Sequence, residues 1–179
     1  MAELIMITRG HGSYTNKDAV EKVIRYITRT RWCENRQNEL IAYGGAGVGI
    51  YLNPAEIIRQ FLYVQNIYNI NNRGGRRIYH EVLSFTDYEF QLLNWDYNSV
   101  LIIAQEISKF YYGNGHQVLF GIHYSEEKRL HIHFAVNTIN YRTGLKWHSS
   151  KIDLEQRKLL FNEIIKKYQY IFIRKSVIA

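Results

Sequence analysis

Three histidines, His123, His131 and His133, lie close together in the chain. His131 and His133 are two residues apart in a strand-like run, so their side chains would lie on one face of a strand. Imidazole nitrogens bind divalent transition metals, and three of them on one surface would leave coordination positions open for a substrate. The spacing therefore predicts a metal site, provided that the fold brings His123 to the same face.

A β-hairpin would bring His123 there. The residues before it also form a strand-like run, and the polar residues 125–129 are typical of a hairpin loop. If Tyr124 pairs with Leu130, His123 lies directly opposite His131, whereas a shift of one residue would turn it to the other face. Apolar residues alternate with the histidines and would form the core face: Val118, Phe120, Ile122, Leu130, Ile132, Phe134 and Val136.

The composition fits one compact domain that binds a polyanion. The 179 residues are 46% hydrophobic and carry a net charge of +7, with a sequence pI of about 9.4. Fifteen tyrosines and three tryptophans add the stacking surface of a single-stranded nucleic-acid binder. The single cysteine, Cys33, excludes an internal disulfide and favours the cytoplasm. No apolar run approaches the ~18 residues of a membrane span.

The periodicity of apolar residues predicts the elements around the hairpin. Strands are expected at 4–8, 78–85 and 170–175, and helices at 15–30, 54–69, 97–112 and 153–168. A central hairpin favours an α+β fold, with a central antiparallel β-sheet and helices packed on one face. The glycine-rich segment 44–49 lacks the Lys-Ser/Thr of a phosphate-binding loop and is expected to be a flexible loop.

A metal beside a basic surface favours phosphodiester chemistry, in which the ion stabilises charge on a phosphate oxygen. Tyr26 is the candidate nucleophile. On a helical wheel it lies about 110° from the centre of the apolar stripe, beside Lys22 and Arg29. These cations would favour the phenolate and could hold a phosphate.

Several short motifs occur in a defined order along the chain. They are Ile24–Thr28, Tyr79–Phe85, Gly115–His123, His131–Asn137 and Thr143–Lys146. Together they resemble the MOBP-type relaxases of mobilizable plasmids and integrative conjugative elements, which belong to the HUH endonuclease superfamily. The similarity covers nearly the whole chain.

This resemblance implies a site- and strand-specific DNA endonuclease with an antiparallel sheet that carries the histidines. A tyrosine would attack the scissile phosphate at a transfer origin, form a 5′-phosphotyrosine bond and free a 3′-hydroxyl, reversibly and without ATP. By match to the motifs, Tyr26 would be the nucleophile, Ser84 would contact DNA near the nick, and Asn137 would brace the site. His123, His131 and His133 would hold the metal, with Mn²⁺ or Mg²⁺ expected and Ni²⁺ or Zn²⁺ as alternatives.

The sequence departs from the family pattern after the first histidine. The family usually has His-x-Asp there, whereas this chain has Ser125, followed by Glu126 and Glu127. The general base is therefore open between a metal-bound hydroxide, a histidine and the field of the metal, with Glu126 as a supporting candidate.

Other basic residues are candidates for a supporting role. Arg73, Arg76 and Arg77 form a basic turn that could contact phosphates. His148 is expected near the site, and His80 is a weaker candidate that could pack in the protein or touch DNA.

The resemblance also bears on partners. Expected partners are single-stranded DNA at a transfer origin, accessory relaxosome proteins and a coupling protein, with no membrane. Relaxases of this class usually continue into a second region, so residues 1–179 are expected to be a single catalytic domain without a C-terminal partner region.

Three other interpretations stay open. A rolling-circle replication initiator or single-strand transposase of the same superfamily would use a later tyrosine, such as Tyr168 or Tyr170. A non-catalytic binding module would stack bases on a sheet without needing metal. A small zinc hydrolase would need a carboxylate base beside the histidines.

Overall fold

The computed structural model describes residues 2–7, 14–30, 34–49, 53–68, 74–125 and 129–178. Five antiparallel strands form one sheet in the order β1-β3-β5-β4-β2. The strands are β1 (Glu3–Met6), β2 (Leu40–Ala46), β3 (Ile78–Ser84), β4 (Val118–Ser125) and β5 (Arg129–Asn137). The helices are α1 (Ala19–Ile27), the 3-10 helix η2 (Glu34–Glu39), α2 (Pro54–Ile67), α3 (Asp87–Leu92), α4 (Tyr97–Gly113) and α5 (Lys151–Ile178).

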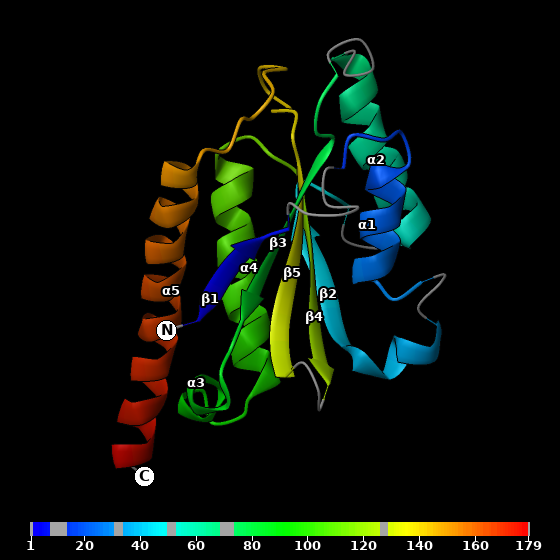
Figure 1. The fold of residues 1–179 in the computed structure, drawn as a ribbon. Coiled ribbons are helices and arrows are strands. Elements are labelled where there is room, and N and C mark those ends of the chain that lie inside the picture. Colours follow the sequence, from blue (N-terminus) through cyan, green and yellow to red (C-terminus); the bar gives the residue numbers. More distant parts are fainter. Residues whose placement is uncertain are drawn as a thin grey trace.

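Helices cover both faces of the sheet. Figure 1 shows α1 and α2 on one side and α4 and α5 on the other. The α+β class and the central antiparallel sheet are thus confirmed, but the expectation that helices cover only one face was wrong. Periodicity within a helix identifies its apolar side, yet it does not say which face of the sheet that side will meet.

The predicted register of the hairpin is confirmed. Tyr124 pairs with Leu130, and His123 lies opposite His131. The seven apolar residues that alternate with the histidines are all buried in the core between the sheet and α4 and α5. A second core lies under α1 and α2, where Ile24 and Phe61 are fully buried against Leu119. The histidine face is therefore part core and part site.

Of the two helices that flank the site, α2 begins where the sequence indicates, whereas α1 begins at Ala19, after the N-cap residue Asp18, and not at residue 15 as expected. Asn53 caps α2 by accepting a hydrogen bond from the backbone N–H of Glu56 at 3.0 Å, and Pro54 occupies the first helical turn. The apolar stripe of α1 is buried as expected, since Val20, Ile24 and Ile27 are each 0% exposed. Packing of this stripe fixes α1 against the histidine face of the sheet.

Two predicted segments take another secondary structure. The glycine-rich segment begins as the edge strand β2 rather than as a loop. Glycine suits position 44 of this strand, because a Cβ there would lie only 2.7 Å from the ring of Phe120. The predicted strand at 170–175 is instead the continuation of α5 to Ile178. No glycine or proline interrupts the sequence after Asp153, so nothing stops the helix.

Within the described residues, no helix has the length and apolar character needed to cross a membrane.

Candidate active site

The three predicted histidines form one buried cluster. One potential ligand atom from each lies within 4.8 Å of the others, and the rings of His123 and His133 are 4.6 Å apart. None of these three histidines is more than 5% exposed. Gly121, opposite His133, leaves room for this arrangement, since a Cβ there would lie 2.8 Å from the carbonyl oxygen of Ile27. The C-terminus of α1 can therefore reach the sheet.

Backbone carbonyls orient two of the rings. His123 donates from Nε2 to the carbonyl of Ile27 at 2.7 Å, and His131 donates from Nδ1 to the carbonyl of Arg129 at 3.0 Å. A neutral imidazole that donates from one nitrogen presents a lone pair on the other. Among the described residues, His123 Nδ1 and His133 Nε2 are buried without a hydrogen-bond partner. Two buried ring nitrogens thus have no hydrogen-bond partner within the described residues and are available as metal ligands.

The surroundings keep two of the three histidines, His123 and His133, neutral. Burial lowers the pKa of His123 to about 3, against an opposing effect of the Ile27 hydrogen bond, and the charge of Arg29 lowers it further. Burial, with the neighbouring histidines, also holds the pKa of His133 well below its usual range. Protons therefore do not compete with a metal ion at neutral pH. Within the described residues, no carboxylate joins the cluster; Glu126 lies outside those residues.

Tyr26 stands beside this cluster. Its ring centroid is 5.3 Å from that of His133 and 6.4 Å from that of His123, with the rings edge to face. The partly buried tyrosine lines a cavity of about 450 Å³ together with Lys22 and Tyr14. The structure thus brings the predicted nucleophile to the same cleft as His133, which is one of the three predicted metal ligands.

Arg29 does not face the cleft as a phosphate contact, which corrects the sequence-based expectation. It is 1% exposed, and its guanidinium forms an ion pair with Glu39 at 2.7 Å. Its Cζ lies 4.7 Å from the centroid of the Tyr26 ring. Arg29 therefore supports the face of Tyr26 rather than DNA.

Two of the other predicted DNA contacts, Lys22 and Ser84, lie near the histidine cluster or the cleft. Lys22 is exposed at the cleft, where it pairs with Asp18 at 2.6 Å, and partly buried Ser84 lies directly opposite His131 in the sheet. Both are placed at the site.

Two arginines of the basic turn, Arg76 and Arg77, bind backbone carbonyls of the protein itself. Arg77 is only 9% exposed and donates to the carbonyl of Thr15 at 3.4 Å, which contradicts its assignment as a phosphate contact. Arg76 donates to the carbonyl of Ile7 at 3.3 Å and lies over the ring of Tyr79. Both tie the N-terminal segment to β3. Arg73 lies outside the described residues.

Asn137 is a bracing residue at a distance from the cluster. It is fully buried and joins α2 to the sheet by donating to Phe61 and Gln117 and accepting from Gln65. Its role in bracing the site stays a prediction.

His148 is exposed, and the segment that carries it packs on the opposite face of the sheet, where Tyr79 donates to the carbonyl of Trp147. The expectation that His148 lies near the site was wrong.

His80 is the residue that sequence reasoning undervalued. It is 5% exposed and its Nε2 lies 2.9 Å from His133 Nδ1, directly behind the cluster. Strand alternation places His80 and Ser84 on one face. The pairing of β3 with β5 was needed to show that this is the histidine face.

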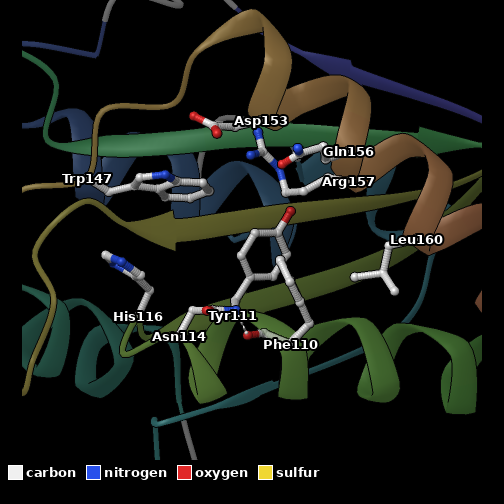
Figure 2. A pocket seen from close by; sticks show the side chains of 9 residues that line it. All are labelled: Phe110, Tyr111, Asn114, His116, Trp147, Asp153, Gln156, Arg157 and Leu160. Atoms are coloured by element: carbon white, nitrogen blue, oxygen red, sulfur yellow. Dashed lines mark hydrogen bonds between the residues drawn. The ribbon is translucent and has the colours of Figure 1, made fainter.

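The opposite face of the sheet carries a second polar cluster. Glu81 accepts hydrogen bonds from Arg157 at 2.7 Å and from the Tyr111 hydroxyl. Figure 2 shows Tyr111 pointing toward Arg157 beneath Trp147, in a cavity of about 370 Å³. Tyr168 lies on α5 on this same side and donates to Glu106. The later tyrosine is thus separated by the sheet from the histidines, against the alternative in which it is the nucleophile.

Comparison with known sequences identifies a family. The sequence profile of the relaxase family described as MobA/VirD2-like, nuclease domain, matches residues 26–170. No curated protein sequence matches the chain. The matched range begins at Tyr26 and contains all three histidines of the cluster.

Proposed function

Because the chain belongs to the family of MobA/VirD2-like relaxase nucleases, we propose that it nicks one DNA strand at a transfer origin by transesterification, with Tyr26 as the nucleophile. The family supports DNA nicking in general. The observation that carries the finer proposal is the position of Tyr26, whose ring lies 5.3 Å from that of His133 in one open cleft.

The chemistry is an exchange of one phosphodiester for another. The Tyr26 hydroxyl oxygen forms a bond to the scissile phosphorus, the bond from phosphorus to the 3′ oxygen breaks, and net transfer of the phenolic proton to that oxygen leaves a 3′-hydroxyl. The product is a 5′-phosphotyrosine. Because the bond formed and the bond broken are of similar kind, the reverse reaction can rejoin the strand.

The histidine cluster fits a divalent ion as cofactor. Its buried, neutral nitrogens suit Mn²⁺, Ni²⁺ or Zn²⁺, and Mg²⁺ less well. When bound, such an ion supplies positive charge that stabilises a non-bridging oxygen of the phosphate. Since all three ligands are uncharged, none of that charge is offset within the ligand set.

The cleft also offers contacts for the strand itself. Tyr14 lines it and provides a ring surface, Lys22 provides an exposed cation, and Ser84 adds a hydroxyl beside His131. In the cell, we expect this single catalytic domain of residues 1–179 to act on single-stranded DNA in the cytoplasm, with accessory relaxosome proteins and a coupling protein, at the start of conjugative transfer.

A covalent-adduct assay tests the proposal. Single-stranded oligonucleotides tiling a candidate transfer origin are incubated with the protein and Mn²⁺, and SDS-resistant adducts are resolved on a gel. We expect an adduct that EDTA abolishes and that Tyr26→Phe lacks. Tyr168→Phe is the matched control and should react normally. An adduct that survives Tyr26→Phe and disappears in Tyr168→Phe would overturn the assignment.

A further inference from the structure

His80 lies behind the histidine cluster and is not itself one of its ligands. Its two ring nitrogens are both engaged, Nε2 with His133 Nδ1 at 2.9 Å and Nδ1 with the Tyr14 hydroxyl at 2.9 Å. His80 and His133 are each at most 5% exposed, so solvent does not readily replace either bond. The three side chains therefore form one hydrogen-bonded chain that ends at the cleft.

Counting protons along this chain leaves two consistent arrangements. In the first, His133 donates from Nδ1 to His80 Nε2, and His80 donates from Nδ1 to the Tyr14 oxygen. In the second, every bond is reversed, so His80 donates to His133 and the proton of His133 sits on Nε2. That nitrogen is buried and faces no partner among the described residues. Only the first arrangement presents a lone pair on His133 Nε2.

We propose that His80, held by Tyr14, is a positioning residue that fixes His133 in the tautomer and orientation that bind the metal. The proposal rests on the metal site of the proposed function. Without an acceptor at His80, the Nδ1 proton of His133 would be buried and unsatisfied, and the ring would turn to find another partner.

The nature of this partner matters for the site. Metal-binding histidines commonly donate to a carboxylate or a backbone carbonyl, and His123 and His131 do donate to carbonyls. His133 instead has a neutral imidazole behind it. A neutral acceptor orients the ligand without adding negative charge, so the charge available to a phosphate is preserved.

Calorimetric titration of the chelator-treated protein with Mn²⁺, without DNA, tests the proposal. We expect His80→Leu to lower the Mn²⁺ affinity by about 10- to 100-fold. His80→Gln should stay within a few-fold of the wild type, because its amide can accept from His133 and donate to Tyr14. Tyr14→Phe should cause a smaller loss than His80→Leu. His116→Leu is the matched control, since His116 is also a buried histidine with a carbonyl partner but lies outside the cluster.

Wild-type affinity in His80→Leu, or equal losses in the Leu and Gln variants, would overturn the proposal. If His80→Leu fails to fold, the ring ¹⁵N shifts of His133 decide the question in the unmodified protein. Protonation at Nδ1 supports the proposal, and protonation at Nε2 in the presence of Zn²⁺ contradicts it. Because no DNA is present, these outcomes are independent of the adduct assay. If the variants show the expected Mn²⁺ affinities but the wild-type protein forms no adduct with DNA, the result counts only against the proposed function.

Discussion

Neighbouring residues of β3 show how differently the two faces of the sheet use buried polar groups. Glu81 points toward α4 and α5, where its carboxylate is met by Arg157 and Tyr111. His80 points the other way, toward a cluster in which His123 Nδ1 and His133 Nε2 have no partner within the described part of the chain. In the Glu81–Arg157 pair only the Nε atom of Arg157 is left without one.

The difference separates stability from function. A buried network in which the charged groups are paired holds elements together, and removing one member costs much free energy of unfolding. Unsatisfied buried nitrogens instead cost free energy until a ligand arrives. The Glu81 face therefore anchors α5 to the sheet, whereas the histidine face offers nitrogens that could hold a metal ion.

The largest expected effect comes from removing two ligands together. His131→Ala/His133→Ala should abolish Mn²⁺ binding and reduce nicking by about 10³-fold, since the charge supplied by a metal contributes several kcal/mol. Single-turnover cleavage and a thermal melt are measured on the same sample. A fall in melting temperature as large as that caused by a change at Glu81 would break the distinction between the two faces.

Glu81→Gln should have the converse effect. It leaves the Arg157 charge buried without its partner, which costs about 3–5 kcal/mol in the free energy of unfolding, while the nicking rate per folded molecule stays unchanged. Chemical denaturation measures the first and active-site-normalised cleavage the second. Glu155→Gln is the control, because its pair with Lys158 is exposed and should contribute less than about 1 kcal/mol.

Acidification should weaken the metal-free protein through the histidine face. Burial lowers the pKa of His80 to about 4 and of His123 to about 3, below the value of about 6.5 in an unfolded chain. Between these values the unfolded chain binds more protons, so stability falls as the pH falls. From pH 7 to pH 5 each histidine accounts for about 2 kcal/mol. Urea denaturation should show this change, and His80→Gln should remove its own share; an unaltered pH dependence in that variant would contradict the argument.

The smallest effect is expected at the rim of the cleft. Lys22→Ala should weaken binding of single-stranded DNA a few-fold and reduce the slope of log affinity against log salt by about one. Stability should change by no more than about 0.5 kcal/mol. Lys158→Ala, on the opposite side of the sheet, is the matched control. Equal losses of affinity in both variants would mean that DNA does not follow this cleft.

The sequence was sufficient for features that depend on local alternation. The pairing of His123 with His131 followed from which residues of the two strands are apolar, because a shift of one residue would have turned imidazoles into the α4–α5 core or Ile132 away from it. The helix that carries Tyr26 followed from its apolar stripe in the same way.

Features that depend on contacts between distant segments could not be predicted. A helical wheel places Arg29 beside Tyr26, but it does not show that Glu39, from the following segment, neutralises the guanidinium. Likewise, nothing in the sequence around His80 indicates that β3 pairs with β5, on which its contact with His133 depends. The end of α5 was misassigned because β-branched and aromatic residues favour a strand locally, although the helix continues.

The hydrogen bond from His123 to the Ile27 carbonyl helps to prepare the site. Ile27 directly follows Tyr26, and Gly121 allows its carbonyl to come within 2.7 Å of His123 Nε2. The backbone that carries the proposed nucleophile is thereby fastened to a proposed ligand of the metal. This hydrogen bond restrains the tyrosine backbone relative to the ligand, so part of the entropy of aligning the two is lost during folding and not when a substrate binds.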